Sequence, residues 1–389
     1  MDIHKYEQMY ETELRTLKKS GISEKNKELI LKFNDELIIE GLSKPRLILY
    51  INKLKVLARR LNKDFDKAKV EDIKRLVSDL QQRDYSPWTK QTYKVVIRRF
   101  YTWLKEASFV DWVNIKISRS EKRLPSEGDL LTEEDVKKLI SSAEHPRDKA
   151  FISMLWESGA RIGELGNLSI KNVCFDKHGV ILSLRGKTGA RKIRLISSTP
   201  YISTWLNMHP FKDDPSSAVW INTGCRNHNQ NMKYSAMCIL VKNLFHKAGL
   251  KKRCNPHMFR HSRATFMADH LTEFQMNQYF GWVQGSDMPA TYVHMSGKNV
   301  DDAILRMNGV ITETKEEVQQ KPRICLKCET INAYDSKHCN KCGGILDLKY
   351  AMEMETERKN ADDMMAKMLE DPRIKEMIFA KMKELKGVF

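Results

Sequence analysis

The chain of 389 residues is long enough for two or three globular domains, and 41% of its residues are hydrophobic. It has no run of about 18 apolar residues, and its first residues lack the apolar segment of a secretory signal, so we expect a cytoplasmic protein without a membrane span. Lys and Arg outnumber Asp and Glu by 67 to 50, and the formal net charge of +17 indicates a polyanionic partner such as nucleic acid or an anionic membrane surface. A basic surface without such a partner fits the charge alone equally well.

Residues 22–108 carry apolar side chains at helical spacing in four segments, which predicts four amphipathic helices. The second begins at Ser43, and the fourth begins at Ser86-Pro87. On one face of the fourth helix three cations recur every four residues: Lys90, Lys94 and Arg98. Such a row suits contact with backbone phosphates of nucleic acid, although a solvated face explains it as well. We expect residues 1–117 to form a helical DNA-binding domain.

The stretch 118–130 is polar and is interpreted as a linker. After it, Thr132 and the acids that follow are typical of a helix N-terminus, where carboxylates are favourable. The pattern then predicts helices at 132–143, 147–159 and 161–168 and a strand near 170–175.

Two alternating stretches, 180–185 and 191–196, are joined by Gly186-Lys187-Thr188-Gly189, which predicts a β-hairpin. Gly-Lys-Thr also occurs at the end of phosphate-binding P-loops, but that motif requires Gly at position 181, which is Ile181. We therefore expect no ATP site. The domain 131–311 is predicted to be mainly helical with a small antiparallel sheet, and the polar segment 312–322 is a second linker.

Two other segments carry groups suited to phosphate chemistry. Arg161 lies beside small residues at a break between helices, where its guanidinium can donate two hydrogen bonds to a phosphate. A salt bridge to Glu164 is the alternative explanation. His257 and Arg260 share one face of a helix that Pro256 begins, so they can address one phosphate at its N-terminus. A satisfied His and a surface Arg explain this segment as well.

Tyr292 follows the segment Phe280-Gly281-Trp282, and nothing intrinsic distinguishes it from a packing residue. Taken in order, however, the segments resemble the catalytic signature of the tyrosine recombinase family, which includes phage integrases and Xer-like enzymes. That signature contains Gly-x-Arg-x-x-Glu-Leu, a hairpin Lys, a His-x-x-Arg-His helix, Leu-Gly-His or Leu-Gly-Trp, and Tyr-x-His. The resemblance covers about residues 130–310, and the N-terminal helices are similar to the family's core-binding, SAM-like domain.

The resemblance implies roles for six residues, which are Arg161, Lys187, His257, Arg260, Trp282 and Tyr292. The two arginines would clamp the scissile phosphate, His257 would assist proton transfer, and Lys187 would protonate the leaving 5′ oxygen. Trp282 fills the His/Trp position, and Tyr292 would attack phosphorus. The sequence departs from the pattern at Phe280, where Leu is usual, and in a Trp282–Tyr292 spacing about one residue longer. Arg191 and Lys192 are rivals for the role of Lys187.

This assignment agrees with the chemistry of phosphoryl transfer. A tyrosine hydroxyl with a pKa near 10 is a poor nucleophile, so cations must stabilise its phenolate character. Two arginines are suited to the charge that develops on the phosphoryl oxygens. A phosphotyrosine conserves the bond energy, so we expect that catalysis needs neither ATP nor a metal.

Four cysteines near the C-terminus have the spacing of a zinc ribbon: Cys325, Cys328, Cys339 and Cys342. Four thiolates close a tetrahedral site, so the expected zinc is structural, within a ribbon at 323–347. Ribbons of this kind resemble additions on some archaeal integrase-like proteins. The tail 348–389 carries Met-rich helical stripes, including Met364 and Met368, and we expect it to contact other subunits.

We therefore predict a site-specific DNA recombinase with a two-domain DNA-breaking-rejoining fold, a zinc ribbon and a C-terminal helix. Its expected partners are double-stranded recombination sites and further copies of itself, as a tetramer in the synaptic complex. Two alternatives are an enzyme that nicks and swivels DNA like a type IB topoisomerase, and a zinc-ribbon DNA-binding protein without catalysis.

Overall fold

A computed structural model gives the structure of the protein in two compact units, Met1–Gly128 and Asp129–Phe389. Three predicted features lie outside the described residues: Lys187, most of both linkers and the end of the tail. The predicted domain boundaries stay predictions. The described residues are 2–117, 126–176, 178–186, 188–225, 227–296, 304–305, 307–310, 322–370, 372–374 and 376–377.

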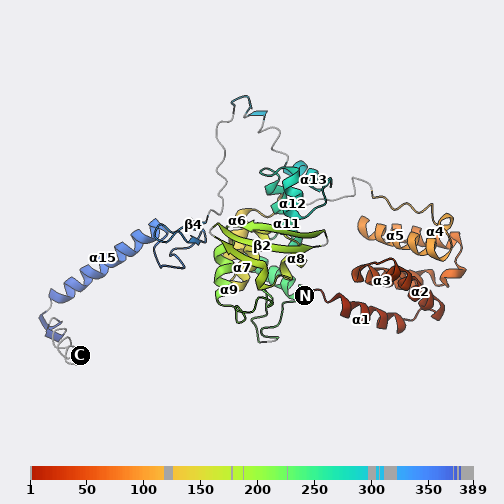
Figure 1. Ribbon diagram of the computed structural model, residues 1–389, viewed down its shortest axis with the longest axis horizontal. Coiled ribbons are helices and arrows are strands. Elements are labelled where there is room, and N and C mark those ends of the chain that lie inside the picture. Colours follow the sequence, from red (N-terminus) through yellow and green to blue (C-terminus); the bar gives the residue numbers. More distant parts are fainter. Residues whose placement is uncertain are drawn as a thin grey trace. The chain divides into compact units, whose positions relative to one another are not determined.

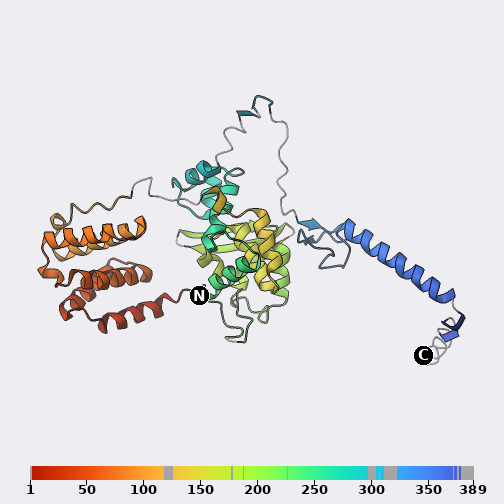
Figure 2. The ribbon, with the colours of Figure 1, turned by 180° about the vertical axis from the view of Figure 1, so that it is seen from behind.

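The first unit is a helical bundle around one apolar core, and its helices lie side by side in both views (Figures 1 and 2). Helices α2 to α5 are the four that the sequence predicted. Helix α1 was not predicted, because it is mostly polar and its buried residues are Tyr10 and Leu17. It packs against α3. The bounds are α1 (Tyr6–Lys18), α2 (Glu24–Ile39), α3 (Lys44–Leu61), α4 (Val70–Gln82) and α5 (Pro87–Leu104), with 3₁₀ turns η1 (Phe65–Lys67) and η2 (Ala107–Phe109).

The second unit is built around α7, which is buried on almost every side and contacts α6, α9, α11 and β3. Thr132 caps α6 through its side-chain oxygen, which accepts a hydrogen bond from the Asp135 N–H, as the sequence predicted. The helices are α6 (Glu133–Ser142), α7 (Pro146–Ser158), α8 (Ile162–Gly166), α9 (Thr199–Asn207), α10 (Tyr234–Lys247), α11 (Pro256–Met267), α12 (Glu273–Phe280) and α13 (Met288–Ser296). Short 3₁₀ turns are η4 (Glu127–Asp129), at the unit boundary, and η5 (Ile170–Asn172).

A three-stranded antiparallel sheet of order β1-β2-β3 lies against α7 and α8 (Figure 1). Its strands are β1 (Val173–Asp176), β2 (Gly179–Gly186) and β3 (Gly189–Leu195). Gly186 pairs with Gly189, so the predicted hairpin is confirmed at both described ends of its turn. The predicted strand begins later than expected, because η5 is held by hydrogen bonds from Ser169 to the Asn172 side chain. A mainly helical fold with small antiparallel sheets is thus confirmed.

The cysteine module contains the short antiparallel strands β4 (Arg323–Ile324) and β5 (Ile331–Asn332). It packs against α9, where the Tyr201 hydroxyl donates a hydrogen bond of 3.0 Å to Asp335. Helix α15 (Leu348–Glu370) follows, and its Met364 and Met368 side chains are exposed. Among the described helices, none combines the length and the apolar character that a membrane crossing requires.

Candidate active site

Arg161 lies at the break between α7 and α8, as the sequence predicted. Helix α7 ends at Gly159 in a left-handed conformation (φ +52°), and a Cβ there would lie 2.6 Å from the Phe280 ring. Only glycine therefore allows this turn to pack so closely. The Arg161 guanidinium donates a 2.9 Å hydrogen bond to Glu164, and the Arg161 side chain remains one third exposed. The salt bridge therefore does not bury this side chain completely.

The Glu164 carboxylate is buried and also pairs with Arg191 on β3, at 2.8 Å. Burial raises the pKa of Glu164, but the hydrogen bonds and charges of Arg191 and Arg161 outweigh it and hold this pKa below its usual value. A Cβ at Gly186 would lie 2.1 Å from the Glu164 carboxylate. The first glycine of the hairpin turn is therefore needed to make room for this carboxylate.

The position of Lys187 lies outside the described residues, but its two rivals can be placed. Arg191 is buried and donates to the carbonyl of Tyr279 as well as to Glu164, so it cross-links the hairpin to α12. Lys192 is exposed on the opposite face of β3, with Arg194, because side chains alternate along a strand. These placements disfavour both rivals as the acid for the leaving group.

Helix α11 positions the predicted His257 and Arg260. The Asn255 side chain accepts a hydrogen bond from the Met258 N–H, and Pro256 begins the helix, so the predicted helix start is confirmed. His257 is exposed, whereas Arg260 is buried. The Arg260 guanidinium donates to the carbonyls of Gly159 (3.0 Å) and Phe280 (2.8 Å), so it joins the α7–α8 break to the end of α12.

Tyr292 on α13 packs face to face with Trp282, with 5.4 Å between ring centroids and 5° between planes. The Phe280 ring also stacks on Trp282, with 4.9 Å between ring centroids. The Arg260 guanidinium lies over both the Phe280 and Trp282 rings. Phe280, which stands where the family pattern has Leu, is thus a packing partner of Trp282. Tyr292 itself is 1% exposed.

The charges of Arg161 and Arg260 shift the pKa values of neighbouring groups in the site. Burial raises the pKa of Tyr292, while the charges of Arg260 and Arg161 oppose the rise. Loss of hydration lowers the pKa of His257, and the same two arginines lower it further. Burial, together with the charge of Arg161, lowers the pKa of Arg260 to about 10. Arg161, His257, Arg260 and Tyr292 therefore share one electrostatic environment.

Sequence reasoning missed His261. Its Nδ1 lies 2.8 Å from the Tyr292 hydroxyl, and desolvation followed by the charges of His257, Arg260 and Arg253 lowers its pKa. The available signal was its spacing, because His261 follows His257 by four residues and so lies on the same face of α11.

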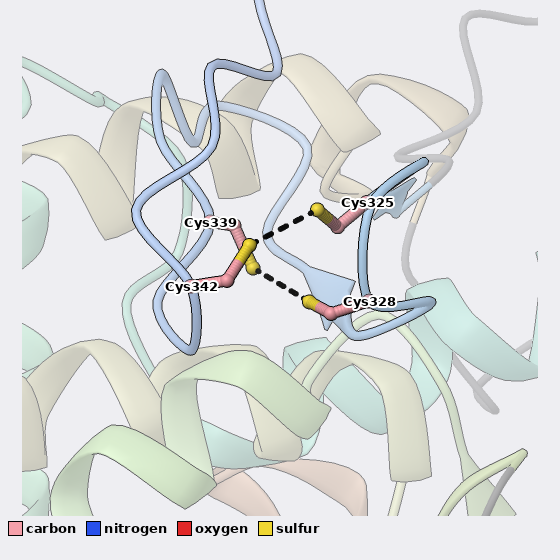
Figure 3. A group of neighbouring side chains, drawn as sticks. All are labelled: Cys325, Cys328, Cys339 and Cys342. Atoms are coloured by element: carbon pink, nitrogen blue, oxygen red, sulfur yellow. Dashed lines mark hydrogen bonds between the residues drawn. The ribbon is translucent and has the colours of Figure 1, made fainter.

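The four cysteine sulfur atoms lie within 4.8 Å of one another, with 3.5 Å between Cys325 and Cys342 and between Cys328 and Cys339 (Figure 3). Zn–S bonds of about 2.3 Å in a tetrahedron place sulfur atoms roughly 3.8 Å apart, so this cluster fits a tetrahedral metal. Hydrogen bonds from the Lys341 N–H and the Asn332 amide to the Cys339 sulfur suit a thiolate ligand. Four cysteines that can bind a metal ion are therefore confirmed as a cluster.

Lys90, Lys94 and Arg98 all lie on α5, so they form the expected row on one helix. Lys90 donates to the Gln81 carbonyl, and Arg98 is 4.0 Å from Asp111. Their role in binding stays a prediction.

Residues 129–298 match the model of the phage integrase family. Among similar proteins, the tyrosine recombinase XerA of Pyrococcus horikoshii is 26% identical over 280 residues, which are 72% of this chain and 93% of that protein. The tyrosine recombinase XerD of Ralstonia nicotianae is 25% identical over a region that covers 64% of this chain and 84% of the XerD chain.

Two solved structures share the fold. The XerH site-specific recombinase in a post-cleavage complex with difH substrate matches with a TM-score of 0.55 at 16% identity, over 79% of this chain and 96% of that one. A lambda integrase tetramer bound to a Holliday junction matches with a TM-score of 0.53 at 13% identity, over 68% of this chain and 76% of that one.

We predict that Glu164→Gln destabilises the protein at neutral pH by about 3 kcal/mol, because it removes the charged partner of two arginines in a buried setting. The pKa of Glu164 is lower in the folded state, so its contribution is complete above its usual pKa of 4.5 and is lost as the pH falls further. The difference in free energy of unfolding between the two proteins should therefore shrink in acid. Urea unfolding at pH 7 and below pH 4.5 measures both values.

Glu273→Gln is the control, because Glu273 is an exposed acid in the first turn of α12. It should change the free energy of unfolding by less than about 0.5 kcal/mol. Equal stabilities for Glu164→Gln and wild type at neutral pH would contradict the assigned role of Glu164.

Proposed function

The chain belongs to the phage integrase family of tyrosine recombinases, and from this premise we propose that it performs site-specific strand exchange through a 3′-phosphotyrosine at Tyr292. The observation that carries the proposal is the convergence of groups from four distant segments. Trp282, after α12, stacks on Tyr292 of α13 and lies under the Arg260 guanidinium of α11. The charges of Arg260 and of Arg161, at the α7–α8 break, both lower the pKa of Tyr292.

In the proposed reaction the two arginines bind the scissile phosphate. Arg161 reaches the DNA from its exposed position, while Glu164 holds one side of its guanidinium. Arg260 is fixed by two backbone carbonyls, so its positive charge is in place before the substrate arrives. As the Tyr292 oxygen bonds to phosphorus, charge grows on the phosphoryl oxygens beside these cations.

Cleavage breaks the bond between phosphorus and the 5′ oxygen, which leaves as a hydroxyl. Lys187 is proposed to supply its proton, because both rivals are disfavoured by their positions, and the exposed His257 assists proton transfer. Trp282 holds the Tyr292 ring through stacking. Rejoining reverses these steps with the 5′ hydroxyl of another strand as nucleophile, so no ATP is needed.

DNA and further copies of the chain are the proposed partners. The net charge of +17 favours DNA, and the solved structures that share the fold are DNA complexes that include a tetramer. We propose a tetramer in the synaptic complex, with the exposed Met side chains of α15 as a surface for subunit contact. Zinc is proposed for the four-cysteine cluster, where it would stabilise the ribbon and leave no ligand position open.

We predict that Tyr292→Phe abolishes a denaturation-resistant protein–DNA adduct, because the phenolic oxygen is the atom that bonds to phosphorus. The assay incubates the protein with a pool of nicked duplexes that contain randomised sequence, and recovers the DNA that remains attached after denaturation. Sequencing of the recovered DNA gives the target duplex for the later experiments.

Tyr201→Phe is the matched control, because it removes the hydroxyl of a buried tyrosine on α9 and should keep the adduct. No adduct with wild type would favour a DNA-binding protein without catalysis. Relaxation of supercoiled DNA without joining of two sites would favour the topoisomerase-like alternative.

We predict that the triple variant Lys90→Ala, Lys94→Ala, Arg98→Ala weakens DNA binding and lowers its dependence on salt. Each lost phosphate contact should reduce the slope of log K against log salt by about 0.9. Fluorescence anisotropy with the target duplex at several salt concentrations measures the slope. Alanine substitution of Lys25, Lys27 and Lys32 on α2, which pair with Glu24 and Glu28, is the control. An unchanged slope in the first variant would rule out the α5 face.

We predict that the purified protein holds one zinc ion per chain and that Cys342→Ser loses it, since four thiolates are needed to close the site. Elemental analysis by mass spectrometry measures the metal. Cys174→Ser is the control, because Cys174 is a lone exposed cysteine on β1. Zinc content that is independent of Cys342 would refute the assignment.

A further inference from the structure

The hydroxyl of Tyr292 lies in a place that water does not reach, because the residue is 1% exposed and packs against Trp282. Among the described residues, its hydrogen-bond partner is the Nδ1 atom of His261, at 2.8 Å. A tyrosine must lose its proton to attack phosphorus, and here that proton needs an acceptor within the protein.

The other groups around Tyr292 cannot accept this proton. Arg260 and Arg161 carry only N–H donors. The Trp282 indole is also only a donor, and it stacks against the face of the Tyr292 ring. Of the groups described here, the imidazole of His261 alone combines contact with the hydroxyl and a free lone pair.

The direction of the hydrogen bond follows from the two protonation states. Desolvation and the neighbouring cations lower the pKa of His261, whereas burial raises the pKa of Tyr292. At neutral pH the imidazole is therefore neutral and the phenol keeps its proton. A buried hydroxyl group donates a hydrogen bond when an acceptor is in reach, so the Tyr292 phenol donates to Nδ1 of His261. The proton of the neutral imidazole then resides on Nε2.

We propose that His261 is the general base for the nucleophile: its Nδ1 takes the Tyr292 proton as the phenolic oxygen bonds to the scissile phosphorus. This inference rests on the proposed function of Tyr292. In the same step the bond from phosphorus to the 5′ oxygen breaks, and that oxygen takes its proton from a different group. In the rejoining step the phosphotyrosine bond breaks, and the His261 imidazolium returns its proton to the Tyr292 oxygen.

The test is single-turnover cleavage of the target duplex by His261→Asn and His261→Leu. The Asn oxygen can accept a hydrogen bond where Nδ1 lies but cannot take the proton, so Asn separates positioning from proton transfer. We expect both variants to cleave about 10²-fold more slowly than wild type. His246→Asn, which changes an exposed His on α10, is the matched control and should cleave at the wild-type rate.

A duplex with a 5′-bridging sulfur at the scissile phosphate identifies which proton is affected. The thiolate leaves without protonation, so this substrate rescues a defect in the acid but not a defect in the base. We expect His261→Asn to stay slow on it. Rescue by sulfur would overturn the proposal, and so would a rate for His261→Asn equal to or faster than wild type.

The pH dependence gives a second signature. The titratable and charged groups that face His261 are His257, Arg260, Arg253 and Tyr292, and Arg161 also acts on Tyr292. Between about pH 7 and 9 wild type should show a flat rate, because its base is already neutral. His261→Asn should rise by about tenfold per pH unit, because hydroxide must then remove the proton. Parallel profiles would overturn the proposal.

Nitrogen NMR of wild type labelled at histidine tests the inference without any variant. The Nδ1 of His261 should be the unprotonated nitrogen, and a proton found there would overturn the proposal. The two proposals also fail in different ways. Loss of the adduct in wild type removes the function of Tyr292, whereas a normal adduct rate in His261→Asn removes only the role of His261.

Discussion

The buried Glu164 carboxylate is the contact on which the candidate site depends. It binds Arg161 and Arg191 at 2.9 and 2.8 Å, and so connects the α7–α8 break to the β-hairpin. Arg191 extends the connection to the Tyr279 carbonyl on α12. The absence of a side chain at Gly186 provides the space for the carboxylate. One buried carboxylate thus connects the α7–α8 break, the β-hairpin and, through Arg191, helix α12.

A second connection runs through Arg260, whose two hydrogen bonds reach the carbonyls of Gly159 and Phe280. The guanidinium is therefore oriented by backbone rather than by acidic side chains, which would cancel its charge. The aromatic rings of Phe280 and Trp282 lie against it and also hold Tyr292. The proposed nucleophile Tyr292 and the guanidinium of Arg260 are in this way positioned by the same aromatic cluster.

The sequence predicted most helices, the hairpin and the cysteine cluster, because apolar spacing, capping residues and cysteine spacing are local signals. Helix α1 was not predicted, because its few buried residues give little helical periodicity of apolar side chains. Arg161 was ambiguous between a phosphate-binding residue and the partner of Glu164; the structure shows the salt bridge and leaves the side chain one third exposed. The contact between His261 and Tyr292 could not be inferred, since it joins residues 31 positions apart on different helices. Contacts of this kind depend on packing, which no local pattern encodes.

The electrostatic balance of the site explains why it suits an anionic substrate. Arg161 and Arg191 pair with the Glu164 carboxylate, whereas Arg260 pairs with backbone carbonyls. Burial and the charge of Arg161 lower the pKa of Arg260 to about 10, although Glu164 opposes this shift. A lowered pKa means that the folded protein holds this positive charge at a cost. Part of that cost is the repulsion between Arg260 and Arg161, which a phosphate placed between them would offset. The part of this cost that comes from repulsion between the two arginines is therefore relieved when a phosphate binds. The attraction between the arginines and the phosphate would increase as negative charge develops on the phosphoryl oxygens.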